Sequence, residues 1–279
     1  MRARTSDGID VAVHELGGDG PPVVFAHATG FHGMVWQPIA ARFKDVFRCI
    51  AFDERGHGDT PPPADSDFEW HGFARDLLAV VDALQLERPY AVGHSAGAAA
   101  IFMAEQERPG TFRAIYGYEP VVIPSEDLPS MPSARANPLA AGARRRREVF
   151  GTRDDAYANY AGKPPFNTLA PAALRAYVDH GFDDLPDGTV RLKCRGENEA
   201  RTYEMSSTHG AFARFGEVKC PVTVACGADT DAFGPPIIEA QAARLPDART
   251  HVFSGLGHFG PLQDPEGVGS HIRDFFRSV

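Results

Sequence analysis

Short apolar runs alternate with segments of helical periodicity along the first part of the chain. Strand patterns cover residues 11–16, 22–27, 46–53, 90–93 and 113–118, and the run at 22–27 is typical of a strand buried on both faces. Helical spacing lies between them at 35–43, 73–84 and 96–107. Repeated β-α-β units of this kind predict an α/β fold with a largely parallel sheet and helices on both of its faces.

This alternation breaks off after residue 120 and resumes near residue 216. The intervening stretch is rich in Pro, Ala and Arg, with helical patterns near 138–150 and 171–182. Strand and helix patterns then return at 221–226, 235–245, 251–253 and 265–276. We therefore expect one structural unit whose core comprises residues 1–120 and 216–279, with a helical cap inserted at 121–215.

Composition excludes several classes of function. The 279 residues carry a formal net charge of −9, which argues against a nucleic-acid partner. No stretch approaches the roughly 20 apolar residues of a membrane span, and Met1–Asp10 lacks the apolar segment of a signal peptide. We expect a cytoplasmic protein with a small-molecule substrate and no membrane partner, and a homodimer is left open.

The four cysteines, Cys49, Cys194, Cys220 and Cys226, show no spacing typical of metal ligands. Cys49 and Cys226 lie in apolar runs that read as strands, so we expect buried free thiols, with a disulfide as the alternative. No other His, Cys, Asp or Glu cluster has ligand spacing, and neither a metal nor another cofactor is expected.

Gly93-His94-Ser95-Ala96-Gly97 fits the G-x-S-x-G pattern of a nucleophile elbow, with an apolar strand before it and a small-residue helix after it. Ser95 must sit in a strained turn that exposes its hydroxyl, and small residues at 93 and 97 permit that turn. Ala98, Ala99 and Ala100 allow the following helix to approach the sheet closely, so that its positive end lies beneath the reacting centre.

The chain resembles capped members of the α/β-hydrolase superfamily over its whole length apart from the cap. Three further segments carry this resemblance: His27-Ala28-Thr29-Gly30, Asp53-Glu54-Arg55-Gly56-His57-Gly58-Asp59-Thr60 and Gly255-Leu256-Gly257-His258-Phe259. It implies a mostly parallel eight-stranded sheet flanked by helices, with Ser95 as nucleophile and His258 as general base. It also implies an oxyanion hole formed by the backbone N–H groups of Thr29 and Ala96. Ala28 stands where the family usually has glycine, which is a departure from the family pattern on that loop.

The acid of the triad should follow the strand at 221–226. Counting from Gly227 places the family's aspartate at Thr230, whereas counting back from Pro235 places it at Asp231. One inserted residue reconciles the two counts, so we expect Asp231, with Asp229 as second choice. Glu119 is the third choice, because some members of the family carry the acid after the earlier strand.

Aromatic residues of the cap and of the two active-site loops are candidates for the wall of a substrate pocket. The candidates are Phe31, Trp36, His94, Phe150, Tyr160, Phe166, His209 and Phe259. Four consecutive arginines, 144–147, cover every side of a helix, so we expect most of these charges to be solvated.

These residues predict an acyl-enzyme hydrolase of carboxylic esters, acting on small to medium apolar substrates. Lactonase, amidase, thioesterase, cofactor-free perhydrolase and carbon–carbon bond hydrolase activities use the same triad and stay open. A ligand-binding receptor on the same fold is the alternative of another class.

Overall fold

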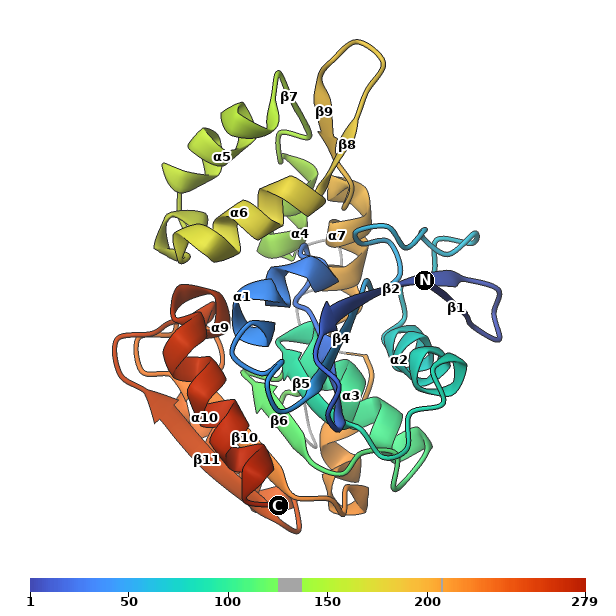
Figure 1. Ribbon diagram of the computed structural model, residues 1–279, viewed down its shortest axis with the longest axis vertical. Coiled ribbons are helices and arrows are strands. Elements are labelled where there is room, and N and C mark those ends of the chain that lie inside the picture. The colour runs from blue at the N-terminus through green and yellow to red at the C-terminus, as the bar shows by residue number, and fades with distance from the viewer. Residues whose placement is uncertain (125–136, 207) are drawn as a thin grey trace.

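The computed structural model describes residues 1–124, 137–206 and 208–279. Within these residues the chain forms a central sheet of eight strands in the order β1-β2-β4-β3-β5-β6-β10-β11 (Figure 1). The strands are β1 (Arg2–Arg4), β2 (Asp10–Gly17), β3 (Pro22–Ala26), β4 (Arg48–Phe52), β5 (Tyr90–His94), β6 (Ile115–Tyr118), β10 (Val222–Gly227) and β11 (Ala248–Phe253). Neighbouring strands are parallel from β4 to β11 in this order. The pairs β1 with β2 and β2 with β4 are antiparallel. The predicted eight-stranded, mostly parallel sheet is confirmed.

Alternate side chains of the parallel strands enter two separate hydrophobic clusters, one on each face of the sheet. In β3, Val24 joins one cluster, whereas Val23 and Phe25 join the other. The first cluster is covered by α2 (His71–Ala83), α3 (Ala96–Glu107) and α8 (Pro235–Arg244), and the second by α1 (Gln37–Ala40) and α10 (Pro265–Arg277). Because helices cover both faces, the inner strands are apolar throughout, as the pattern of residues 22–27 indicated.

Most of the described residues between β6 and β10 form a lobe above the sheet in Figure 1. Its helices are α4 (Pro138–Arg144), α5 (Arg153–Ala161), α6 (Pro171–His180) and α7 (Gly196–Glu204), with the short 3₁₀ turn η3 (Phe166–Thr168). A second 3₁₀ turn, η4 (Ala211–Glu217), leads back toward β10 and packs against α3 and α8 of the core. The lobe also contains a small antiparallel sheet of β7 (Val149–Phe150), β9 (Val190–Leu192) and β8 (Phe182–Asp184). We call this segment, residues 121–215, the insert; residues 125–136 and 207 of it lie outside the described residues.

The small sheet differs from the expectation of a purely helical insert. Its strands have only two or three residues each, which is too short for a strand pattern to be recognised in the sequence. The expected helix at 138–150 accordingly ends at Arg144, and the expected helix at 171–182 ends at His180.

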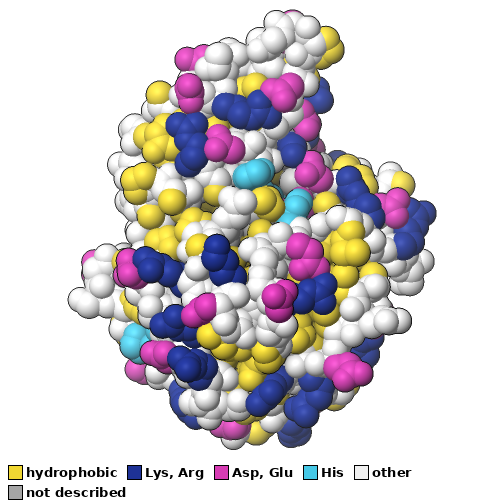
Figure 2. Space-filling model, in the orientation of Figure 1, with side chains coloured by type: hydrophobic (Ala, Val, Ile, Leu, Met, Phe, Trp, Pro, Cys, Tyr) yellow, Lys and Arg dark blue, Asp and Glu magenta, His cyan; other side chains and the backbone are white. Residues whose placement is uncertain are grey.

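The surface mixes charges of both signs with apolar side chains (Figure 2). In the described part of the chain, no helix is both long and apolar enough to cross a membrane. All four cysteines are buried and unpaired, as predicted.

Candidate active site

Ser95 lies at the turn between β5 and α3 in a strained conformation. Its φ is 56° and its ψ is −115°, in a region that side chains rarely adopt. A Cβ atom at Gly93 would lie 2.4 Å from Ala98 Cα, and one at Gly97 would lie 2.5 Å from the carbonyl group of Ala26. Only glycine fits these two positions, which is the steric requirement that the sequence pattern indicated.

His258 lies on the loop between β11 and α9 (Gly260–Gln263), with its Nε2 atom 3.2 Å from Ser95 Oγ. Two hydrogen bonds fix this loop: His94 Nε2 donates to the carbonyl of His258 at 2.8 Å, and the Tyr118 hydroxyl donates to the carbonyl of Gly257 at 2.9 Å. Burial and the neighbouring His258 ring lower the pKa of His94 well below its usual value. His94 is therefore a neutral donor that positions His258, rather than an open part of a pocket wall.

The carboxylate that contacts His258 belongs to Glu119. Its Oε2 atom lies 2.7 Å from His258 Nδ1, and the side chain is completely buried. Asp231 and Asp229, which we expected first and second, are both exposed on the turn after β10. The structure thus places the third candidate where the first was expected.

Buried Glu119 receives hydrogen bonds from several groups besides His258. Oε1 accepts from the N–H of Gly227 at 3.0 Å, whereas Oε2 accepts from the Thr230 hydroxyl at 2.8 Å and the N–H of Phe233 at 3.3 Å. These donors compensate for the hydration that the carboxylate loses on burial. The turn after β10 therefore supplies hydrogen-bond donors to Glu119, and neither of its aspartates takes the place beside His258.

Backbone hydrogen bonds tie Glu119 to Ser95 through β6. The N–H of Ser95 donates to the carbonyl of Tyr118 at 2.9 Å, and the N–H of Val121 donates to the carbonyl of Ser95 at 3.2 Å. Between them, the N–H of Glu119 donates to the carbonyl of Ala225 in β10 at 2.8 Å. Ser95 and Glu119 are thus held by the same ladder of main-chain bonds.

The two expected oxyanion donors lie on adjacent elements. Ala96 is the first residue of α3, where a helix leaves its N–H groups without helical acceptors. Thr29 follows β3, whose last residue, Ala26, pairs with Gly93 of β5. Both positions are consistent with donors that point toward one reacting oxygen.

The loop that carries Thr29 is braced from the turn after β4. The Nε2 atom of His27 accepts a hydrogen bond from the N–H of Glu54 at 3.0 Å, and its Nδ1 atom donates to the carbonyl of Ala28 at 2.9 Å. A carboxylate oxygen of Asp53 accepts from the N–H of Gly33 at 2.7 Å. These bonds give the motif residues His27 and Asp53 a bracing role.

Four of the aromatic candidates form a continuous cluster beside His258. The ring centroid of Phe31 lies 5.7 Å from that of Phe166 and 5.6 Å from that of Phe259, while Phe166 lies 4.7 Å from Tyr160. Because Phe259 also contacts the His258 ring at 5.2 Å, this aromatic cluster joins the insert to the loop that carries His258. Tyr177, which we did not single out as a pocket candidate, completes the cluster at 5.2 Å from Phe31.

The remaining pocket candidates lie elsewhere. Trp36 is buried against Phe25, in the hydrophobic cluster that α1 and α10 cover. Phe150 is buried within the insert against Phe182. His209 stacks on Trp70 and its Nε2 donates to the carbonyl of Val121. Trp36 and Phe150 are buried and His209 is half-buried, so we interpret all three side chains as packing residues.

Sequence reasoning also missed Arg146 and Glu199, which form an ion pair inside the insert. The arginine run predicted mostly solvated charges, and Arg144 is indeed paired on the surface with Glu197 and Glu204. Arg146 instead points inward, and only the three-dimensional packing of α7 against α4 brings Glu199 to it.

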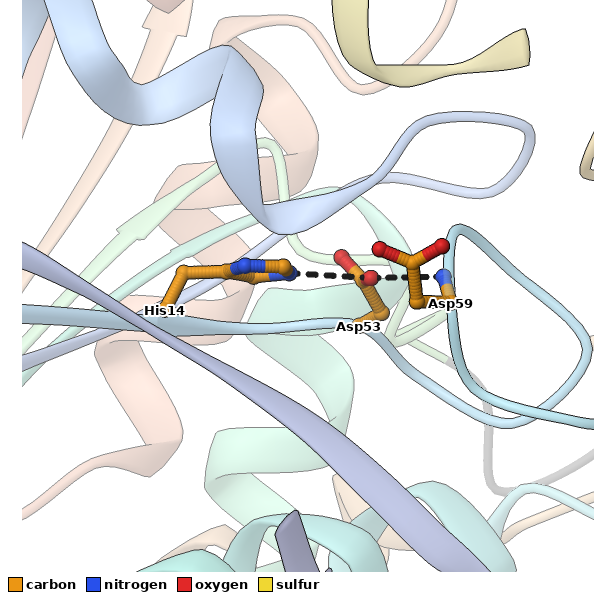
Figure 3. A group of neighbouring side chains, drawn as sticks. All are labelled: His14, Asp53 and Asp59. Carbon is orange, nitrogen blue, oxygen red and sulfur yellow. Dashed lines mark hydrogen bonds and ion pairs between the residues drawn. The ribbon is translucent and has the colours of Figure 1, made fainter. Parts of the chain in front are cut away.

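One group of side chains in the described residues is close enough to share a cation: His14, Asp53 and Asp59 (Figure 3). Protein donors already occupy it, since Asp53 accepts from His14 at 2.9 Å and from the N–H of Asp59 at 2.8 Å. Although burial raises the pKa of Asp53, the contact with His14 holds it well below its usual value. The ammonium of Lys193 lies 2.6 Å from Asp59 and supplies positive charge there. We interpret this group as a brace between the core and the insert.

Comparisons with known proteins agree with this architecture. A model of the alpha/beta hydrolase family matches residues 23–270. A 2-(acetamidomethylene)succinate hydrolase from Mesorhizobium japonicum is 24% identical, with 92% of this chain and 88% of the relative covered. A putative carbamate hydrolase from Variovorax paradoxus is 26% identical, with 94% of this chain and 93% of the relative covered. The crystal structure of E-2-(acetamidomethylene)succinate hydrolase superimposes with a TM-score of 0.83 at 23% identity, covering 99% of both chains, which shows a shared fold.

Proposed function

The chain belongs to the alpha/beta hydrolase family, and from this premise we propose that it is a serine hydrolase acting through an acyl-enzyme. Ser95 is the nucleophile, His258 the general base and Glu119 the acid. The observation that carries the proposal is the chain of contacts from Ser95 Oγ through both ring nitrogens of His258 to Glu119 Oε2. A buried carboxylate on Nδ1 leaves Nε2 as the proton acceptor that faces the hydroxyl.

In the first half-reaction Ser95 Oγ bonds to the carbonyl carbon of the substrate while its proton passes to His258 Nε2. The carbonyl oxygen becomes an oxyanion, for which the N–H groups of Thr29 and Ala96 are the proposed donors. When the intermediate collapses, the bond to the leaving group breaks and His258 gives its proton to the departing oxygen or nitrogen.

In the second half-reaction His258 takes a proton from water, whose oxygen bonds to the acyl carbon. Collapse of this intermediate breaks the bond to Ser95 Oγ, and His258 returns the proton to the serine. Glu119 stabilises the positively charged ring in both halves without itself becoming protonated. No metal or organic cofactor enters these steps.

We propose carboxylic esters as the substrates. The aromatic cluster of Phe31, Phe166 and Phe259 beside His258 supports an apolar acyl or alcohol group of small to medium size. Lactones and thioesters present the same electrophilic carbon to the same groups.

Cleavage of an amide or carbamate bond is the second candidate. The two curated relatives are described as hydrolases of an acetamido compound and of a carbamate. The triad can serve such bonds because protonated His258 can donate to a leaving amine.

The proposal is tested with a fluorophosphonate probe and with matched p-nitrophenyl acetate and p-nitroacetanilide. Wild-type protein should form one covalent adduct, on Ser95, and should release p-nitrophenol from the ester. Ser95→Ala should abolish both reactions while leaving the circular dichroism spectrum unchanged. Faster turnover of the anilide would favour the second candidate, whereas a folded protein that neither labels nor turns over would favour a receptor.

A further inference from the structure

Arg146, just after α4, has a buried set of partners within the insert. Its Nη1 atom is paired with the carboxylate of Glu199, and its Nη2 atom donates to the hydroxyls of Tyr177 at 2.5 Å and Tyr160 at 3.2 Å. The side chain of Arg146 is 16% exposed and that of Glu199 is 8% exposed. We call these four residues the Arg146 group.

The Arg146 group lies directly against the loop that carries Thr29. A Cβ atom at Gly30 would lie 2.8 Å from Glu199 Oε1 and 3.4 Å from Arg146 Nη1. The ring of Tyr177 contacts Phe31, the next residue along this loop. The group therefore borders the place where the carbonyl of a substrate would bind.

The two tyrosine hydroxyls have protons to donate. A guanidinium has no acceptor, so each hydroxyl must accept from Arg146 and direct its own proton elsewhere. In the described residues neither hydroxyl donates to a protein acceptor, although Tyr177 is 1% exposed and Tyr160 is 7% exposed. Buried hydroxyl groups normally donate to a partner. A hydroxyl that already accepts a hydrogen bond from a charged group is a stronger donor, because the two hydrogen bonds polarise each other.

We propose that the Arg146 group is a substrate subsite that recognises an uncharged oxygen acceptor, such as a ketone, amide or ether oxygen, remote from the bond being cleaved. The assignment of that bond to Ser95 rests on the proposed function, whereas binding at the subsite does not. The preferred substrates then carry an oxygen atom on an otherwise apolar frame.

The charge balance selects an uncharged group over a carboxylate. Glu199 already neutralises Arg146, so a second carboxylate would leave a net negative charge in a largely buried place. It would also face repulsion from Glu199 and lose its own hydration. A neutral oxygen brings no second negative charge and can accept from the two tyrosine hydroxyls.

The test uses three methyl esters of matched shape: methyl pentanoate, methyl 4-oxopentanoate and monomethyl succinate. Because the subsite can serve either side of the scissile bond, butyl acetate and 2-methoxyethyl acetate form a second pair. The readout is the ratio of kcat/KM for each oxygen-bearing ester to that of its apolar partner, corrected for hydroxide-catalysed rates. Tyr177→Phe and Tyr160→Phe each remove one donor and retain the ring, and circular dichroism checks their folding.

In Tyr177→Phe, the kcat/KM ratio of at least one oxygen-bearing ester to its apolar partner should fall about three- to tenfold. This fall corresponds to the loss of one neutral hydrogen bond. Tyr160→Phe gives a second reading if Tyr177→Phe does not fold. Tyr157→Phe is the matched control, since Tyr157 is on the same helix as Tyr160 but stacks under Arg175; its ratios should equal those of the wild type. Three outcomes would overturn the proposal. The ratios could stay unchanged in both the methyl-ester series and the acetate pair, they could fall equally in Tyr157→Phe, or the protein could prefer monomethyl succinate.

The same comparison by NMR titration of the Ser95→Ala protein needs no turnover. If the wild-type protein cleaves no ester, the affinity ratios in this background, with and without Tyr177→Phe, still decide whether the subsite exists. Loss of the proposed function and loss of the subsite are thus separate results.

Discussion

The hydroxyl of Thr230 donates a 2.8 Å hydrogen bond to Glu119 Oε2, the oxygen atom that also contacts His258 Nδ1. Counting from Gly227 placed the expected aspartate at position 230. The side chain at that position reaches the acid site, but it carries a donor rather than a carboxylate. The side chains of positions 119 and 230 therefore meet at one carboxylate oxygen, which also contacts His258.

Replacing Glu119 should separate the candidate acids. Glu119→Gln should lower kcat for p-nitrophenyl acetate by about 10³- to 10⁴-fold, because the amide can favour the wrong tautomer of His258. Asp231→Asn and Asp229→Asn should each stay within about twofold, because surface substitutions rarely matter. A strong loss in Asp231→Asn with little effect of Glu119→Gln would return the role to the turn.

Moving the acid to position 230 should restore part of the activity. In the double variant Glu119→Gln/Thr230→Asp, a carboxylate replaces the hydroxyl that lies next to Oε2, so it can approach His258 Nδ1. We expect kcat at least tenfold above that of Glu119→Gln alone. Thr230→Asn in the same background is the control, since it has the same shape without the charge; equal rates in the two double variants would contradict the prediction.

The free energy of unfolding should decrease as the pH falls below about 6.5. Burial is the main cause that lowers the pKa of His27 to about 3 and that of His209 to about 4, from the ordinary 6.5. Between these values the unfolded chain binds protons that the folded chain excludes, so this contribution is fully present above pH 6.5 and is lost toward pH 4. Urea unfolding at several pH values measures it, and His209→Gln should show a shallower decline over this window.

The buried pair of Arg55 and Asp76 should be a strong determinant of stability. Arg55 Nη2 lies 2.7 Å from Asp76 Oδ1, with the two side chains 2% and 0% exposed. Asp76→Leu leaves a buried guanidinium with incomplete compensation, so we expect a loss of about 3–5 kcal/mol in the free energy of unfolding. Asp82→Ala, which breaks the exposed pair with Arg108, should cost only about 0–1 kcal/mol. Similar losses in the two variants would contradict this interpretation.

The sequence predicted the parts of the fold and site that depend on local pattern. Apolar runs marked the buried strands, and the glycines around Ser95 marked a turn that only they can form. The acid could not be found in this way, because its place depends on which strands are neighbours. Tyr118 of β6 pairs with Ala225 of β10, so the residues that follow both strands reach the same edge of the sheet. Spacing along the chain cannot distinguish them.

The Arg146 group escaped prediction for a similar reason. A run of four arginines has the same local pattern whether one of them points inward or none does. Only the packing of α7, α6 and α5 around residue 146 gives that side chain a carboxylate and two hydroxyls. The three strands of the small sheet were missed because segments of two or three residues carry no periodic signal.

The ladder that links Ser95, Tyr118, Val121 and Ala225 has a consequence for how the protein loses activity on heating. The amides of Ser95, Glu119 and Val121 are bonded within the central sheet, so we expect them to exchange with deuterium as slowly as the core strands. The aromatic cluster between the insert and the core consists of side-chain contacts such as Phe31 with Phe166, and we expect the amides of the insert to open at lower free energy. Gentle warming should then weaken substrate binding first, while the reactivity of Ser95 toward a small phosphonylating agent persists until the whole sheet melts.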